Sequence, residues 1–337
     1  MNNFHELSDE QKRLVLRSAE EQIHLPAVAI EKDMWVTCIL QVLFSLDLNA
    51  HIIFKGGTSL SKFENLIERF SEDIDIAIDP AVYGIEGNPT KKQLKTLRKR
   101  SSLYVKEVLA VALQAGLEKY GLTDQLALEV EPDGEGDSTY PEPRRIFIKY
   151  PSLLADKYNY IKNEVVLEVG SRSLVEPMVE HHIKSMIETQ FPTVVTSLVN
   201  PMIATAAPIK TFVEKACLLH ELFSIPRETI VANRRSRHLY DLERMMDKDF
   251  AKAAVTDNAL WESILHHRAV FTSMRDVDYS VDFRDNIVLT PPQEWLSDWE
   301  EDYRKMCQTM IYGDKLPFDK LMDRMHELER RFRERGK

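Results

Sequence analysis

The stretch that decides the fold is FKGGTSLSKFENLIERFSEDIDIAI, residues 54–78. It contains a Gly-Gly-Thr-Ser turn after a short apolar run, then a helical segment, and then an alternating strand that opens with Asp73 and Asp75. Glycines let a backbone come close to a phosphate, and carboxylates are ligands that divalent cations prefer. The order of these features predicts a site that binds a polyphosphate together with metal ions.

The two aspartates are two positions apart on a strand predicted over residues 74–78, so their side chains point to the same face. The isoleucines between and after them point to the opposite face and into the core. Two like charges on such a strand are costly to desolvate unless a cation lies between them, and Mg²⁺ is the obvious cation. Two alternatives stay open: the pair caps an exposed strand, or it holds a nucleotide-sugar diphosphate in a glycosyltransferase.

The turn supplies the second half of the predicted site. Gly56 and Gly57 allow positive φ and close backbone approach, and Thr58 and Ser59 are expected to cap the next helix and bind phosphate oxygens. In isolation this is also an ordinary strand-to-helix turn, but its spacing to the Asp-x-Asp strand favours phosphate binding. The turn is neither a Walker loop nor a Gly-x-Gly-x-x-Gly dinucleotide turn.

The remaining periodicity predicts an α+β chain. Residues 1–205 are expected to form a small mixed sheet flanked by helices, and residues 206–337 a helical bundle that completes the active-site cleft. The predicted elements of the first part are helices that begin at a capping box at residues 8–11 and at Pro26, a long helix over 90–115, and strands over 51–54, 74–78, 127–131, 145–150 and 165–169. After Pro208 helical periodicity is nearly continuous, with amphipathic stretches at 250–270, 292–311 and 317–335.

Composition indicates a globular protein, because 44% of the 337 residues are hydrophobic and 29% are charged. Three widely spaced cysteines, Cys38, Cys217 and Cys307, predict neither a disulfide framework nor a zinc site. We therefore expect a reducing, cytoplasmic setting. No signal pattern and no apolar run of about 18 residues is present, so we expect no membrane span.

The formal net charge of −10 argues against indiscriminate binding to polyanions. Two basic runs are local exceptions, and each is either a solvated helix face or a contact surface. The first comprises Lys91, Lys92, Lys95, Arg98, Lys99 and Arg100, and the second Arg234, Arg235, Arg237 and His238.

Residues 54–78 resemble the first two motifs of the AbiEii/AbiGii-type nucleotidyltransferase toxin family, within the DNA polymerase β-like nucleotidyltransferase superfamily. The resemblance covers roughly residues 25–250, and the remainder matches no pattern. Further similar segments are IEKDMWVTCILQVLF (30–44), IKYPSLL (148–154), NEVVLEVGSRS (163–173), FVEKACLLHEL (212–222) and RSRHLYDLERM (235–245).

The resemblance implies a role for each motif residue. Asp73 and Asp75 would bind Mg²⁺, and the Gly-Gly-Thr-Ser turn would hold the phosphates of a nucleoside triphosphate. Lys215 would neutralise the β and γ phosphates, and Asp241 would position that lysine or the incoming hydroxyl. A structural salt bridge between two helices is the alternative for Lys215 and Asp241.

A third metal carboxylate is usual in the superfamily. Glu168, in VVLEVG, is favoured because it lies between apolar residues, and Glu129, in LALEVEP, is the alternative. Lys32 and Asp33 resemble the Glu-Lys-Asp signature of the family and are interpreted as scaffolding.

The resemblance implies transfer of a nucleotide to RNA, at the 3′ end of tRNA, with growth arrest as the outcome and a separate antitoxin protein as the neutralising partner. Two alternatives remain from the residues alone: a small molecule or a protein as acceptor, supported by the acidic net charge, and a non-catalytic nucleotide-binding module.

Overall fold

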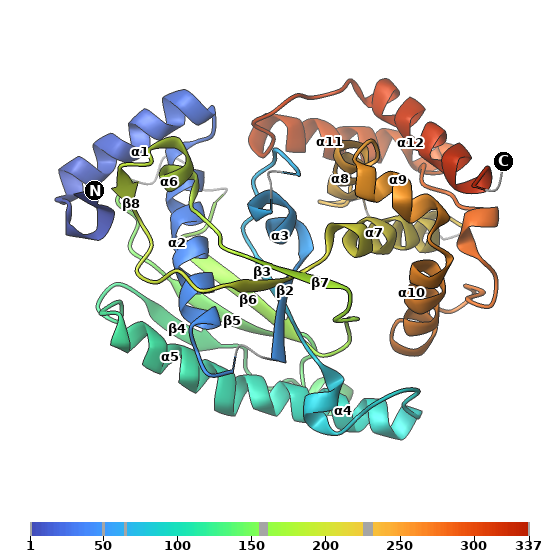
Figure 1. The fold of residues 1–337 in the computed structure, drawn as a ribbon, viewed down its shortest axis with the longest axis horizontal. Coiled ribbons are helices and arrows are strands. Elements are labelled where there is room, and N and C mark those ends of the chain that lie inside the picture. Colours follow the sequence, from blue (N-terminus) through green and yellow to red (C-terminus); the bar gives the residue numbers. More distant parts are fainter. Residues whose placement is uncertain (1, 49–50, 64–65, 155–160, 225–231, 336–337) are drawn as a thin grey trace. The chain divides into compact units, whose positions relative to one another are not determined.

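A computed structural model describes residues 2–48, 51–63, 66–154, 161–224 and 232–335. The chain forms two compact units, one of Met1–Phe63 with Phe70–Ala206, the other of Glu64–Arg69 with Ala207–Lys337. The first unit carries the sheet and the second is helical (Figure 1). The predicted α+β class is therefore confirmed. The sequence did not predict that residues 64–69 belong to the second unit.

The first unit is built on a seven-stranded mixed sheet with the order β4-β5-β6-β3-β2-β9-β7. Strand β3 pairs antiparallel with β2 and parallel with β6. The five predicted strands agree with the structure within one residue, but β7 and β9 were not predicted, so the sheet is larger than expected. The strands are β2 (Ile52–Lys55), β3 (Ile74–Ile78), β4 (Ala127–Val130), β5 (Arg144–Lys149), β6 (Glu164–Gly170), β7 (Met178–His181) and β9 (Ile203–Ala206).

One face of this sheet is apolar and buried, and the other, here called the polar face, carries charged side chains together with the buried Ile53 and Ala77. The buried side chains come from alternate positions of neighbouring strands, as period-two geometry requires: Phe54, Ile74, Ile76, Ile146, Ile148, Leu167 and Val169. Helix α2 (Ala27–Phe44), which is buried along nearly its whole length, packs on β6 and on helix α5 (Ala110–Lys119). The polar face is therefore the one available for chemistry.

The helices of the first unit begin largely where the sequence predicts. Ser8 and Gln11 form the predicted capping box of α1 (Asp9–Ile23), and Pro26 is the N-cap of α2. The predicted long helix consists of α4 (Lys91–Tyr104), a π-helical turn (Val105–Leu109) and α5. The shorter elements are α3 (Gly56–Lys62), α6 (Met186–Gln190) and a two-stranded parallel sheet of β1 (Asn2–Asn3) and β8 (Val194–Val195).

The second unit packs its helices around aromatic side chains. Phe332 lies 5.2 Å from Trp261 and 6.0 Å from Phe212, measured between ring centroids. The helix predicted over residues 250–270 is interrupted, because Asp257 caps a new helix by accepting the N–H of Leu260. The helices are α7 (Pro208–Phe223), α8 (Arg237–Met245), α9 (Asp249–Thr256), α10 (Asn258–Phe271), α11 (Leu296–Thr309) and α12 (Phe318–Arg333).

Two expectations from composition can be compared with the structure. Cys38, Cys217 and Cys307 are free thiols in the structure. Within the described part of the chain, no helix has both the length and the apolar character needed to cross a membrane.

Candidate active site

Four charged residues lie side by side across the polar face of the sheet. The strand register pairs Lys55 with Asp75, Asp75 with Glu168, and Glu168 with Arg145. Residues paired in this way point to the same face and are close enough to interact. Glu168 accepts a hydrogen bond from Arg145, with 2.9 Å between Oε1 and Nε. The sheet therefore places the favoured third carboxylate directly beside Asp75.

The alternative carboxylate, Glu129, lies elsewhere. It is on the edge strand β4, and strands β5 and β6 separate it from β3. Its carboxylate accepts a hydrogen bond from Lys149 at 2.8 Å, and both side chains are exposed. Cross-strand pairing alone accounts for this contact.

Asp73 comes directly before β3, and Asp75 is the second residue of that strand. Both are partly exposed while Ile74 and Ile76 are buried, as the alternation predicts. Among the residues that the structure describes, no three His, Cys, Asp or Glu side chains are gathered closely enough to hold a metal ion. In this arrangement Glu168 is directed to Arg145, so metal binding by Asp73, Asp75 and Glu168 stays a prediction.

The glycine turn lies against the carboxylate of Asp75. Gly56 has φ of +82°, and a β-carbon at this position would lie 2.1 Å from Oδ2 of Asp75. Only glycine fits, both because of the left-handed backbone and because the space is occupied. The two motifs of residues 54–78 thus meet at one point.

The hydroxyl groups of the turn behave differently from the prediction. Helix α3 begins at Gly56, and its N-cap, Lys55, makes no side-chain cap bond, so the expectation that Thr58 and Ser59 cap the helix is wrong. The positive φ of Gly56 allows the helix to start early and leaves both hydroxyls inside its first turns. Thr58 donates to the carbonyl of Asp73 at 2.5 Å, and Ser59 donates to the carbonyl of Gly56 at 2.8 Å. Thr58 therefore ties the turn to the start of the Asp-x-Asp strand.

Helix α2 holds both ends of the connection between the turn and β3. Lys32 is paired with Glu72, with 2.8 Å between Nζ and Oε2, and Asp33 is paired with Lys62, with 2.5 Å between Oδ1 and Nζ. Asp33 also accepts the backbone N–H of Met186 at 2.7 Å. These contacts agree with the interpretation of Lys32 and Asp33 as scaffolding.

The second unit brings together Lys215 of α7 and Asp241 of α8, with 2.9 Å between Nζ and Oδ2. Asp241 is fully buried. Burial alone would raise the pKa of Asp241, but the charges of Arg69 and Lys215 outweigh it and hold that pKa well below its usual range. Burial lowers the pKa of Lys215, and Asp241 offsets part of the effect.

Sequence reasoning missed two residues of this cluster. Arg69 forms a bidentate ion pair with Asp241, with Nε 2.7 Å from Oδ1 and Nη2 2.8 Å from Oδ2. His238 lies on the other side, with Nδ1 3.4 Å from Nζ of Lys215. The sequence contained one signal for Arg69, because this charged residue lies within the largely apolar run LIERF, residues 66–70. An arginine that is buried with such a run needs an acidic partner. The contact of His238 also means that the second basic run is not one continuous exposed surface.

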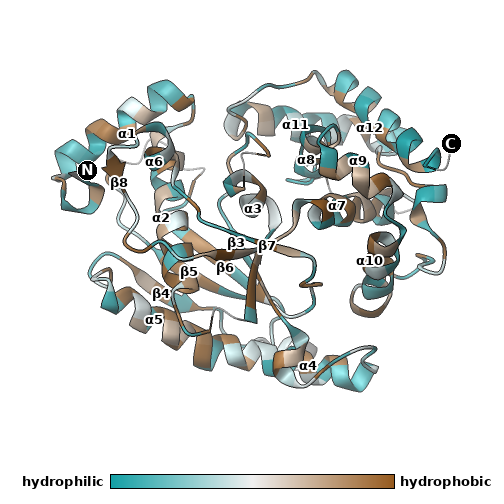
Figure 2. Cartoon of the chain, in the orientation of Figure 1, coloured by the Kyte–Doolittle hydropathy of each residue, from teal (hydrophilic) through white to brown (hydrophobic). Residues whose placement is uncertain are grey.

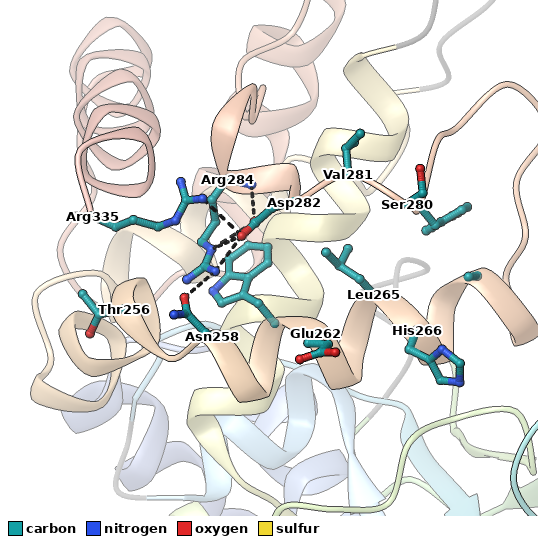
Figure 3. A pocket seen from close by; sticks show the side chains of 13 residues that line it. Thr256, Asn258, Glu262, Leu265, His266, Ser280, Val281, Asp282, Arg284 and Arg335 are labelled. Atoms are coloured by element: carbon teal, nitrogen blue, oxygen red, sulfur yellow. Dashed lines mark hydrogen bonds and ion pairs between the residues drawn. The ribbon is translucent and has the colours of Figure 1, made fainter.

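A cavity of about 740 Å³ lies in the second unit, and none of the residues predicted for the site lines it. Figure 3 shows the guanidinium groups of Arg284 and Arg335 directed at the carboxylate of Asp282, and all three residues line this cavity. Arg284 also donates to the carbonyl of Val255 and to Asn258. These guanidinium groups therefore serve to hold the fold together. A cavity of about 530 Å³ in the first unit is lined by residues 183–200, which include none of the predicted site residues.

Comparison with known protein families identifies the class of this chain as nucleotidyltransferase. Residues 39–324 match the family described as "Nucleotidyl transferase AbiEii toxin, Type IV TA system". This match spans most of the chain, so the protein belongs to the AbiEii family of nucleotidyltransferase toxins of type IV toxin–antitoxin systems. The family resemblance predicted from the motifs is confirmed, and the family implies a nucleotide substrate and an antitoxin partner.

Among solved structures, the chain is similar to MenT4, a nucleotidyltransferase toxin from Mycobacterium tuberculosis H37Rv. The two share 15% sequence identity over 97% of this chain and 98% of that chain, with a TM-score of 0.47. Similarity of this size is distant and does not bear on the site. The chain matches none of the curated proteins.

Proposed function

We propose that this toxin transfers a nucleotidyl group from a nucleoside triphosphate to the 3′ end of tRNA in the cytoplasm, in a Mg²⁺-dependent reaction that its antitoxin prevents. The observation that carries the proposal is the contact between Gly56 and the carboxylate of Asp75. A glycine backbone directly beside an acid is what a metal-bound triphosphate requires, because phosphate oxygens must reach the metal and the backbone N–H groups together.

The residues of the first unit fit a hard divalent cation. Asp73 and Asp75 supply oxygen ligands, and Glu168 is the neighbour of Asp75 in the strand register. Glu168 would exchange its bond with Arg145 for a place in the metal site, and the register favours it over Glu129. When bound, Mg²⁺ would supply activation of the attacking hydroxyl and neutralisation of charge on the pyrophosphate.

The chain itself positions the reactants. The backbone N–H groups of Gly57 and Thr58 would hold phosphate oxygens, since the first N–H groups of a helix have no partner within that helix. The acceptor hydroxyl attacks the α-phosphorus, the bond to the bridging β-phosphate oxygen breaks, and pyrophosphate leaves. Lys215 would add fixed positive charge at the β and γ phosphates, with Asp241 holding its ammonium group.

Helix α4 supports RNA as the acceptor. Lys91, Lys92 and Lys95 are exposed on its first turns, and none of them pairs with an acid in the described part of the chain. Figure 2 shows this end of α4 as hydrophilic. Arg98 and Arg100 are held by the backbone carbonyls of Tyr140 and Tyr83. Positive charge concentrated on one helix of an acidic chain favours a local contact with phosphates over general polyanion binding.

The direct test is transfer of label from each α-³²P nucleoside triphosphate to total tRNA in the presence of Mg²⁺. We expect labelled tRNA with at least one triphosphate, and no label with EDTA. Label in a small molecule or a protein would instead select the alternative acceptor. Absence of any labelled product together with absence of triphosphate binding in calorimetry would contradict the proposal.

The RNA surface has its own test. Charge reversal at Lys91, Lys92 and Lys95 is expected to raise the KM for tRNA about tenfold and to reduce its salt dependence, because fewer phosphates are neutralised. The KM for the triphosphate should not change. Reversal of Lys305 and Lys320, which are exposed but paired with Glu301 and Asp323, is the matched control. An unchanged KM for tRNA in the α4 variant would remove this helix from the acceptor site.

A further inference from the structure

Residues 66–69, here called the strap, lie in sequence between α3 and β3 but belong to the helical unit. Ile67 is fully buried. The backbone carbonyl of Glu68 accepts the N–H of Tyr312 at 3.0 Å, and the side-chain carboxylate of Glu68 pairs with Arg244 at 2.5 Å. Arg69 forms a β-bridge with Ile311. The strap is therefore fastened to the second unit by both its backbone and its side chains.

The side chain of Arg69 ends at Asp241, the carboxylate that also pairs with the proposed phosphate-binding lysine, Lys215. Arg69 directs one nitrogen to each carboxylate oxygen of Asp241, whereas the ammonium nitrogen of Lys215 lies 2.9 Å from Oδ2. Arg69 and Asp241 are both nearly inaccessible to solvent, at 1% and 0% exposure. An ammonium group carries three N–H bonds, and Asp241 and His238 account for two of those on Lys215. One N–H can thus be directed to a phosphate oxygen.

We propose that Arg69 is a positioning residue for nucleotidyl transfer: it occupies both oxygens of Asp241, so that Lys215 is held by one oxygen and stays available to the polyphosphate. This inference rests on the proposed function of Lys215. Without Arg69, Lys215 would be the main cation for a buried carboxylate and would pair with it more tightly. A bidentate guanidinium pair also has a defined geometry that a lysine cannot reproduce.

The first experiment compares Arg69→Gln with Arg244→Gln. Both arginines pair with an acid, but Arg244 is partly exposed and pairs with Glu68, whereas Arg69 is buried and pairs with Asp241. With folding checked by circular dichroism, we expect Arg69→Gln to raise the KM for the triphosphate at least tenfold and Arg244→Gln to stay within twofold of the wild type. A folded Arg69→Gln protein with wild-type kcat and KM would overturn the inference.

A second measurement does not need turnover. Trace acetylation of the Lys215 amine is followed by mass spectrometry across pH in the same variants. The charged and titratable groups around this amine are Asp241, His238 and Arg237 of α8 and Arg69 of the strap. Loss of the Arg69 charge should move the midpoint of reactivity to higher pH, because that charge lowers the pKa of Lys215. An unchanged midpoint would contradict the inference.

The two readouts separate the two proposals. If the wild type transfers no nucleotide but the midpoint moves in Arg69→Gln, the proposed function fails and the effect of Arg69 on Lys215 stands. If Arg69→Gln does not fold, Arg69→Lys is the variant that tests the inference, since lysine keeps the positive charge but cannot form the bidentate pair with Asp241. A KM raised at least threefold in Arg69→Lys supports the inference, and a wild-type KM overturns it.

Discussion

Gly56 lies so close to Asp75 that a β-carbon on Gly56 would be 2.1 Å from the Oδ2 atom of that aspartate. The turn predicted to bind phosphate and the predicted metal ligand Asp75 are therefore packed directly against each other. Thr58 strengthens this unit by donating to the carbonyl of Asp73. A change in the turn should act on the acid directly.

Replacement of Gly56 by alanine should displace Asp75 and reduce nucleotidyl transfer by about 100-fold, a loss comparable to removal of one charge-stabilising group. The matched control is Gly84→Ala, because Gly84 also has positive φ, at +69°, but a β-carbon there meets nothing within 4 Å. Both variants should lose about 1 to 2 kcal/mol of unfolding free energy from the left-handed backbone. Equal activity losses in the two variants would show that the collision with Asp75 does not matter.

Replacing one carboxylate at a time should show how much each of Asp75, Glu168 and Glu129 contributes to nucleotidyl transfer. We expect Asp75→Asn to lose about 1,000-fold or more in kcat, and Glu168→Gln to need a higher Mg²⁺ concentration for half-maximal rate, since one oxygen ligand is lost. Glu129→Gln should behave as wild type because Glu129 contacts only the exposed Lys149 among its described ion-pair partners. Titration of the rate with Mg²⁺ measures this requirement in each variant. If Glu129→Gln needed more Mg²⁺ and Glu168→Gln behaved as wild type, Glu129 would be the third metal ligand.

The free energy of unfolding should depend strongly on Asp241. Asp241→Asn removes the negative charge that pairs with the buried cations Arg69 and Lys215, and breaking such a buried pair costs about 3 to 5 kcal/mol in comparable sites. Asp247→Asn is the control, because Asp247 pairs with Arg324 and Arg331 at the surface and should contribute less than about 1 kcal/mol. Urea unfolding at pH 7 measures both. Similar small losses would mean that the buried cluster contributes little net stability.

The rate of nucleotidyl transfer should fall at alkaline pH. Lys215 must be protonated to neutralise phosphate, and burial lowers its pKa from the ordinary lysine value of 10.5. The alkaline limb of kcat/KM should therefore lie below pH 10.5 and disappear in Lys215→Arg, which stays charged. A limb that is unchanged in Lys215→Arg would assign the titration to another group.

Stability at mildly acidic pH should depend on His220. Burial lowers the pKa of His220 from 6.5 to about 4, and its Nδ1 accepts the N–H of Val288 at 3.1 Å. Between these two pH values the unfolded chain binds a proton that the folded chain does not, so stability falls as the pH falls, by about 3 kcal/mol at most. Urea unfolding of wild type and His220→Gln from pH 7 to pH 4.5 tests this. The variant should lose less stability over that range, and parallel curves would contradict the prediction.

The sequence predicted the strands that have a regular pattern and missed those that do not. Strand β3 agrees with its predicted bounds, residues 74–78, because its three buried isoleucines alternate with Asp75 and Ala77. Strand β9 is buried at every position and so shows no alternation, and β7 is a short strand at the edge of the sheet. The helix start at Gly56 was also missed, because it depends on a positive φ that the Thr-Ser pair does not reveal.

The sequence by itself determined the chemical groups and their order: the glycine turn, the two aspartates, Lys215, Asp241 and the family to which they belong. Only the tertiary structure decided which of them touch. Three contacts join residues that are distant in sequence: Gly56 with Asp75, Asp75 with Glu168, and Arg69 with Asp241. Strand register and the pairing of buried charges follow from how the whole chain packs, and local periodicity carries no information about either.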